Sequence, residues 1–99
     1  MSQTVMQMRW AGVTPEQYEE ARSRVDWEGQ PADGGMFHVA GFDGGALCVT
    51  DVWESPEHFQ RFAEERLMPV VREIGIEDEP EVTFYPVQAI FNARVPAAA

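Results

Sequence analysis

Two adjacent glycines, Gly44 and Gly45, join two runs of residues with high strand propensity, GMFHVAGFD and ALCVTDVW. A Gly-Gly pair between such runs is typical of a two-residue β-hairpin, because the turns that match the strand twist need positive φ angles. If these glycines form the turn, Asp43 pairs with Ala46, and every further pair of the hairpin follows from this one.

The hairpin places alternate side chains on opposite faces of the sheet. We expect one face to carry four facing pairs: Met36 with Trp53, His38 with Asp51, Ala40 with Val49, and Phe42 with Leu47. A one-residue bulge would break this assignment, because a single slip moves every following side chain to the other face.

The segments around the hairpin predict two strands and two helices. Residues 3–10 alternate as a strand, and Thr14, Pro15 and Gln17 form the start signal of a helix over 15–25. Ser55 and Pro56 start a second helix that ends at Gly75, and residues 81–91 form a last strand. The resulting βαββαβ order predicts a ferredoxin-like α+β fold, a four-stranded antiparallel sheet with both helices on one face.

Two prolines stand inside these predicted elements. Pro69 lies within the second helix and should kink it, because it removes a backbone hydrogen bond and clashes with the carbonyl of Glu65. The kink would either leave room for a ligand above the sheet or be a local irregularity. Pro86 indicates that the last strand is an edge strand or contains a bulge.

Both faces of the predicted sheet are largely apolar, although two helices can cover only one of them. The face opposite His38 carries Phe37, Val39, Cys48 and Val52 among its residues. A bare apolar face of this size would be adhesive. We therefore expect a homodimer in which two copies pack sheet against sheet.

Length and charge exclude several classes of protein. The 99 residues suit one domain over 1–99, with 94–99 as a frayed tail. A net charge of −10 argues against nucleic acid or an anionic membrane as a partner. The single cysteine excludes an internal disulfide, and we find no signal peptide and no apolar run of membrane-spanning length, so a cytoplasmic location is expected.

The segments HVAGFDGG and VTDVWESPEHFQRFAEERLMPVV, within this element order, resemble the dimeric α+β barrel superfamily. That superfamily includes antibiotic-biosynthesis-monooxygenase-like proteins, and the same segments are similar to a small uncharacterised actinobacterial group. The resemblance covers nearly the whole chain. It implies the fold more than the function, because this fold hosts oxygenases, cyclases, isomerases, haem-handling proteins and proteins without known activity.

His38 and Asp51 are the candidate catalytic residues. Facing side chains on neighbouring strands have Cβ atoms about 4.5–5.5 Å apart, which allows an imidazole and a carboxylate to form a hydrogen bond. Asp51 would orient His38 and raise its basicity, leaving the other ring nitrogen free to exchange a proton. The same pair also fits a purely structural role, in which the two side chains satisfy each other's hydrogen bonds within the sheet.

Aromatic and large apolar residues would line a cavity around this pair, and they equally fit an ordinary core. The candidate substrate-binding residues are Trp53, Met36, Trp10, Tyr18, Phe42 and Leu47. His58, in the first turn of the second helix, is expected to be exposed and without a role. His38 and His58 do not form a metal-ligand motif, so no metal is expected.

These observations lead to one main hypothesis and two alternatives. We expect a small enzyme without a bound cofactor that acts on an apolar, aromatic or polyketide-like molecule by proton transfer through His38, as an isomerase, cyclase or monooxygenase. The substrate class comes from the resemblance. The alternatives are a non-catalytic dimer that binds a ligand or a partner, and haem binding through His38.

Overall fold

The chain folds into a βαββαβ unit, as predicted. The computed structural model describes residues 3–93, so the predicted frayed tail over 94–99 lies outside the described residues. The elements are β1 (Thr4–Ala11), α1 (Pro15–Val25), β2 (Gly35–Asp43), β3 (Ala46–Trp53), α2 (Pro56–Phe62), the π-helical segment η1 (Ala63–Leu67), α3 (Met68–Ile74) and β4 (Glu81–Pro86).

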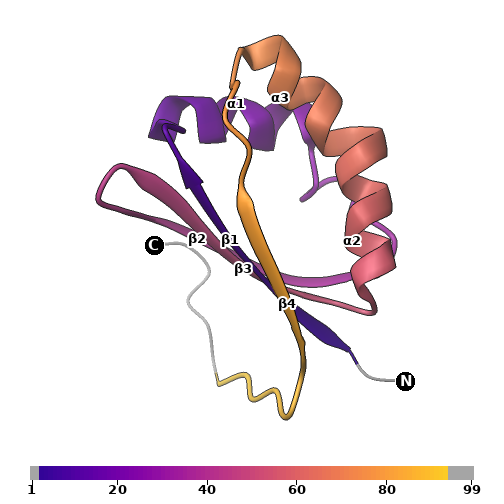
Figure 1. Cartoon of the computed structure of the whole chain (residues 1–99). Helices are drawn as coiled ribbons and strands as arrows, with labels where there is room; N and C mark the ends of the chain where they lie inside the picture. Colours follow the sequence, from indigo (N-terminus) through magenta and orange to yellow (C-terminus); the bar gives the residue numbers. More distant parts are fainter. Residues whose placement is uncertain (1–2, 94–99) are drawn as a thin grey trace.

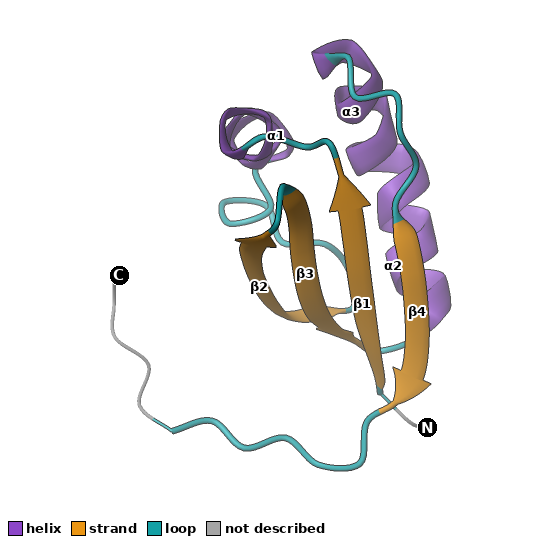
Figure 2. Ribbon diagram, turned by 60° about the vertical axis from the view of Figure 1, so that its left-hand side comes forward, coloured by secondary structure: helices purple, strands orange, loops and turns teal. Residues whose placement is uncertain are grey.

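The four strands form one antiparallel sheet in the order β2-β3-β1-β4. Both helical segments lie on the same side of this sheet (Figures 1 and 2). The ferredoxin-like fold class is therefore confirmed. The core between the sheet and the helices contains Met6, Met8, Trp10, Val13, Leu47, Val49, Trp53, Phe59 and Val71.

The first helix starts at a complete capping box. The Oγ1 of Thr14 accepts a hydrogen bond from the backbone N–H of Gln17, and the Gln17 side chain accepts one from the Thr14 N–H. Pro15 occupies the first helical position, where its missing N–H costs nothing. The helix ends at Asp26, which is left-handed with φ of 58°. The predicted range of this helix is thus correct.

The hairpin register is confirmed from His38 to the turn, with His38 opposite Asp51 and Phe42 opposite Leu47. The turn glycines have φ angles of 58° and 81°, as primed turns require. The prediction that Met36 faces Trp53 is wrong. A bulge between Gly35 and Phe37 leaves Met36 as the extra residue, and Gly35 faces Trp53 instead.

Pro69 is accommodated by a change in helix geometry in the preceding turn. Residues Ala63–Leu67 are π-helical, and the N–H of Met68 bonds to the carbonyl of Ala63, five residues earlier. The wider turn lets the helical ribbon continue from α2 through to α3 (Figure 1). No helix within residues 3–93 is long and apolar enough to cross a membrane.

The last strand is shorter than predicted. It ends at Pro86, which pairs with Thr4 at the first residue of β1. One further hydrogen bond follows, from the Val87 N–H to the Gln3 carbonyl at 2.9 Å. Residues 87–91 then lie outside the strand, because β1 offers no further partner. The prediction of an edge strand is correct, since β4 is at the end of the sheet.

The core face of β1 generates a prediction about stability. Met6 is fully buried at the centre of the core, whereas its neighbour Gln7 is exposed on the other face. We expect Met6→Ala to lower the free energy of unfolding by about 2–5 kcal/mol, because it removes buried atoms and leaves a cavity. Chemical denaturation measures this change. Gln7→Ala is the matched control, and an equal loss in both variants would contradict the assigned faces.

Candidate functional site

A cavity of about 260 Å³ lies between the sheet and the helices, within the core just described. Its wall is mainly apolar, and His38 and Asp51 supply its ionisable side chains together with the phenol of Tyr18. It is lined by Met6, Met8, Trp10, Val13, Gln17, Tyr18, Ala21, Trp27, Pro31, Ala32, Gly35, Met36, Phe37, His38, Leu47, Val49, Asp51, Trp53, Phe59, Phe62, Leu67, Val71 and Ile76.

A chain of hydrogen bonds runs across one wall of this cavity. The indole N–H of Trp53 donates to Oδ2 of Asp51 at 3.0 Å, and Nδ1 of His38 lies 2.7 Å from Oδ1 of the same carboxylate. On the other side of the ring, Nε2 of His38 lies 2.8 Å from the hydroxyl of Tyr18. Asp51 is only 5 % exposed, and both of its carboxylate oxygens accept hydrogen bonds from protein donors, as buried polar groups generally do.

The hydrogen-bond partners assign the proton positions in this chain. A carboxylate only accepts, so Nδ1 of His38 carries a hydrogen and donates to Asp51. In the neutral ring Nε2 is then the acceptor, and the Tyr18 hydroxyl donates to it. Burial raises the pKa of Tyr18 to about 12, which keeps this phenol protonated at neutral pH.

Aromatic rings surround the imidazole on the side of α1. The Tyr18 ring lies parallel to the His38 ring, with 6.2 Å between centroids. Trp27 packs against both, at 5.8 Å from Tyr18 and 5.3 Å from His38. The side chain of His38 nevertheless remains 32 % exposed. The imidazole is therefore held in place and still accessible from the cavity.

The segment that carries Trp27 is fastened to the second helix by Arg66. The guanidinium donates to the carbonyls of Val25 and Gln30, at 2.9 and 2.7 Å. On the outer side, Arg22 donates two hydrogen bonds to Glu28 at 2.6 and 2.9 Å, and these hold the pKa of Glu28 below its ordinary value. These contacts fix the position of Trp27 beside His38.

The structure brings most of the predicted site residues together. Trp53, Trp10, Tyr18, Leu47 and Met36 all line the cavity with His38 and Asp51, although Met36 does so from the bulge. Phe42 is not among the lining residues, and its ring packs edge-on against Tyr18 with 6.4 Å between centroids.

Several lining residues were not predicted from the sequence. Trp27 follows the first helix in a loop without apolar periodicity, so its aromatic character is the only signal that the sequence offers. Phe59 and Phe62 lie three residues apart in the second helix, a spacing typical of a buried helical stripe, and they pack on Trp53 with 5.5 Å between centroids in each pair. A helical stripe does not reveal which of its members border a cavity, because that depends on how closely the helix approaches the sheet.

The cavity offers no fixed positive charge to an anionic ligand. All seven basic residues of the chain are arginines, and none of those within residues 3–93 lines the cavity. The buried Asp51 adds negative charge to one wall. A ligand carboxylate would therefore lose its hydration without gaining an ionic partner, so the cavity favours neutral ligands.

Comparison with known proteins identifies relatives of the fold. No protein-family model and no curated protein matches the chain. A mutant of SnoaB, a cofactor-independent oxygenase from Streptomyces nogalater, is similar in structure, with a TM-score of 0.67 and 13% identity over 94% of this chain and 100% of that chain. The ActVA-Orf6 monooxygenase of Streptomyces coelicolor, in complex with nanaomycin D, has a TM-score of 0.61 and 16% identity, covering 94% of both chains.

A protein of unknown function from Nitrosomonas europaea is similar over 99% of this chain and 98% of that chain, with a TM-score of 0.67 and 14% identity. At such identities the likeness shows a shared fold. The chain thus shares its fold with these structures and with a putative antibiotic biosynthesis monooxygenase from Chloroflexus aurantiacus, in agreement with the fold that the sequence resemblance implied. The narrower similarity to an actinobacterial group stays a prediction.

The raised pKa of Tyr18 predicts how stability depends on pH. Folded Tyr18 keeps its proton to about pH 12, whereas an unfolded tyrosine releases it near about pH 10. Its contribution to stability is therefore present below about pH 10 and is lost as the pH rises to 12. Solvent screening reduces the effect, because Tyr18 is only half-buried.

Chemical denaturation across this pH range, compared between wild type and Tyr18→Phe, measures the effect. We expect wild type to lose more stability than the variant, which has no phenol to titrate. Equal losses in the two proteins would show that Tyr18 is not buried as described.

Proposed function

We propose that the protein is a small cofactor-independent enzyme that transfers a proton to and from a neutral aromatic or apolar molecule. His38 would be the general base and acid, and Asp51 would orient it. One observation carries this proposal: the hydrogen-bonded chain Trp53–Asp51–His38–Tyr18 ends inside an apolar cavity. Hydrogen bonds that only stabilised the sheet would have no need to extend to the wall of a cavity.

The geometry suggests how the proton moves. Nε2 of His38 is occupied by the Tyr18 hydroxyl, so a substrate in the cavity would meet the phenol oxygen first. The substrate C–H or O–H bond breaks, its proton goes to the Tyr18 oxygen, and the Tyr18 proton passes to Nε2 of His38. The electron pair stays on the substrate as an enolate or phenolate.

A concerted transfer suits the high pKa of Tyr18, because no free tyrosinate has to form. Asp51 stabilises the imidazolium that results, through a hydrogen bond between charged groups that is worth about 1.5–3 kcal/mol. Returning the proton to a different substrate atom completes an isomerisation or assists a cyclisation. With O₂ as a second reactant, the same enolate or phenolate supports a monooxygenase reaction.

The cavity limits what the substrate can be. An apolar cavity of about 150 Å³ is large enough to bind benzene, so a volume of about 260 Å³ suits one or two rings. Larger, polyketide-like molecules would have to extend beyond the cavity. A phenol hydroxyl would donate a hydrogen bond to the Tyr18 oxygen, whose own hydrogen is donated to His38, and a carboxylate would find no cation.

One observation favours the alternative of a non-catalytic binding protein. The Tyr18 hydroxyl already satisfies Nε2 of His38, so the polar chain is complete without a substrate. In that case the cavity would hold a neutral ligand against Trp27 and Trp53 without chemistry. Binding and proton transfer must therefore be measured separately on the same molecule.

β-Tetralone separates the two functions, because it is a neutral two-ring ketone with acidic C–H bonds beside its carbonyl. We expect saturable quenching of tryptophan fluorescence on binding. We also expect protein-catalysed exchange of these hydrogens in heavy water, followed by proton NMR. His38→Ala should slow the exchange by ~10²–10⁴-fold, the usual contribution of a general base, while binding is retained.

Two controls accompany this experiment. Asp51→Asn should reduce the exchange rate more than the binding, because it alters the orientation and basicity of His38 rather than the apolar wall. A tetralone that carries a carboxylate should bind at least about tenfold more weakly, equivalent to 1.4 kcal/mol. Equal exchange in wild type and His38→Ala would contradict the proposed enzyme, and binding without exchange would favour the binding protein.

We also propose that two copies pack sheet against sheet as a homodimer. The face of the sheet away from the helices leaves Val39 50 % and Tyr85 43 % exposed. These residues lie on β2 and β4, at the two edges of the sheet. A second copy would bury this surface and explain why both faces of the sheet are apolar.

Light scattering coupled to size exclusion tests the dimer. We expect a dimer at micromolar concentration for wild type. Val39→Asp should shift the protein toward monomer, because it places a charge on the apolar face of the edge strand β2. Ser23→Asp adds the same charge on the exposed side of α1 and should leave the dimer intact. A monomeric wild type, or an unchanged mass for Val39→Asp, would contradict this arrangement.

A further inference from the structure

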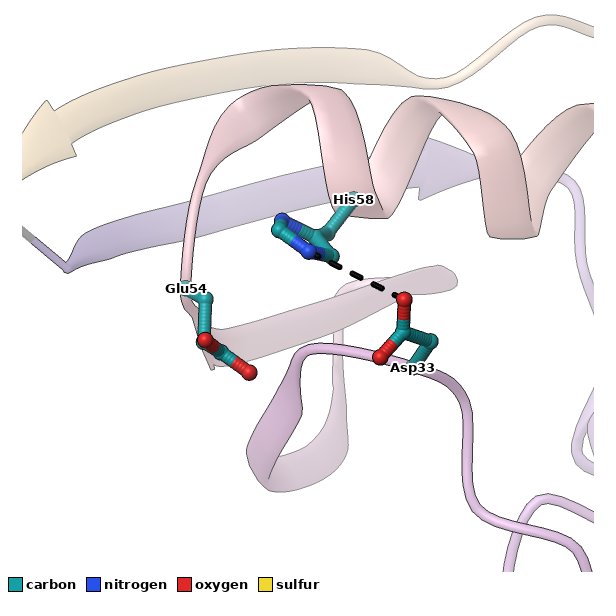
Figure 3. A group of neighbouring side chains, drawn as sticks. All are labelled: Asp33, Glu54 and His58. Carbon is teal, nitrogen blue, oxygen red and sulfur yellow. Dashed lines mark ion pairs between the residues drawn. The ribbon is translucent and has the colours of Figure 1, made fainter.

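Three side chains that can bind a metal ion meet outside the cavity. They are Asp33, from the loop before β2, and Glu54 and His58, from the turn between β3 and α2 and the first turn of α2 (Figure 3). The sequence predicts no metal site because His38 and His58 form no ligand motif and no third ligand is evident, whereas the fold brings Asp33 and Glu54 to His58. We propose that these three residues form a binding site for Zn²⁺.

The distances suit a shared metal ion. One ligand atom from each residue lies within 4.8 Å of the other two. Zinc bonds to histidine nitrogen and carboxylate oxygen are about 2.0–2.2 Å long, which places tetrahedral ligands about 3.5 Å apart. Asp33 and Glu54 are exposed, so small rotations of their side chains would bring the ligand atoms to about 3.5 Å from one another without moving the backbone.

The backbone around the three residues is fixed independently of any metal. The N–H of Glu54 donates to the carbonyl of Gly34 at 2.8 Å, which joins the loop to the turn. Gly34 has a φ of 83°, and a Cβ at this position would clash with the ring of His58. A glycine is therefore required here, and its absence of a side chain lets the loop lie directly against the imidazole.

Ser55 orients the histidine toward the two carboxylates. Its Oγ lies 2.6 Å from Nδ1 of His58 and also accepts a hydrogen bond from the His58 backbone N–H at 3.2 Å. Nε2 faces Asp33, with 3.9 Å between Nε2 and Oδ2 (Figure 3). If Nδ1 donates to Ser55, Nε2 presents its lone pair to the metal, as in histidine ligands that are oriented by a second hydrogen bond.

The charges around the cluster also favour a cation. Two carboxylates lie together in a protein with a net charge of −10, and the guanidinium of Arg61 lies 3.7 Å from Asp33. Asp33 is 81 % exposed, so this ion pair is weak and a metal ion can displace it. One imidazole with two carboxylates suits Zn²⁺ and leaves a fourth position for water.

Bound Zn²⁺ would connect the loop before β2 to the start of α2. Asp33 follows Ala32 and Glu54 follows Trp53, and both of these neighbours line the cavity. The ion would therefore fasten the rim of the cavity without entering it. Since the site exists only in the folded chain, zinc should raise the midpoint of thermal unfolding.

Isothermal titration of the full chain with Zn²⁺ tests the site. We expect one ion per chain, and affinity reduced by at least about tenfold in His58→Ala and in Asp33→Asn, since each removes a ligand. Ser55→Ala should weaken binding by ~10-fold, because it removes the hydrogen bond that orients His58, together with the N-cap of α2. Co²⁺ should give visible absorption bands that His58→Ala abolishes. Circular dichroism verifies that each variant is folded.

His38→Ala and Cys48→Ser are the matched controls, because they remove the other histidine and the only cysteine. Both should bind Zn²⁺ as wild type does. The proposal is overturned if zinc does not bind with a defined stoichiometry, if His58→Ala binds as tightly as wild type, or if His38→Ala abolishes binding. None of these outcomes depends on the proposed catalytic role of His38.

Discussion

A buried carboxylate organises the centre of this protein. Asp51 lies in the middle strand pair, where an unpaired charge would be costly, and it is stabilised by donors on both of its oxygens. One donor is Trp53, two residues along the same strand, and the other is His38, directly across the hairpin. The carboxylate thus fixes the orientation of two large rings on the core face, and those rings form one wall of the cavity.

The opposite wall depends on how the helices pack over the sheet. A π-helical turn accommodates Pro69, and Arg66 within that turn reaches the carbonyl of Val25 at the end of α1 and that of Gln30 in the loop that follows. These bonds hold Trp27 against His38 and Tyr18. The π-helical turn that accommodates Pro69 therefore also shapes the space next to the imidazole. The cavity is a consequence of the packing of both helices rather than of any one motif.

The sequence predicted the fold and the central pair because these depend on local rules. Gly44 and Gly45 specify a turn, the turn specifies a register, and the register places His38 opposite Asp51. Thr14 and Gln17 likewise specify the start of α1. The prediction for Met36 failed because a bulge beside Gly35 costs little at the end of an edge strand and leaves no clear pattern in the sequence. The last strand was predicted too long because its apolar residues continue beyond the end of its partner.

The sequence by itself thus determined the order of elements, the pairing of His38 with Asp51 and the apolar character of both sheet faces, since hydrogen bonding and periodicity act between residues at known spacings. Only the tertiary structure decided that Tyr18 reaches Nε2 of His38, that Trp27 covers the imidazole, and that Asp33 meets Glu54 and His58. The latter contacts join segments whose distance is set by how closely the helices and loops pack on the sheet. That distance depends on the volumes of many side chains together, so it cannot be predicted from any short stretch of sequence.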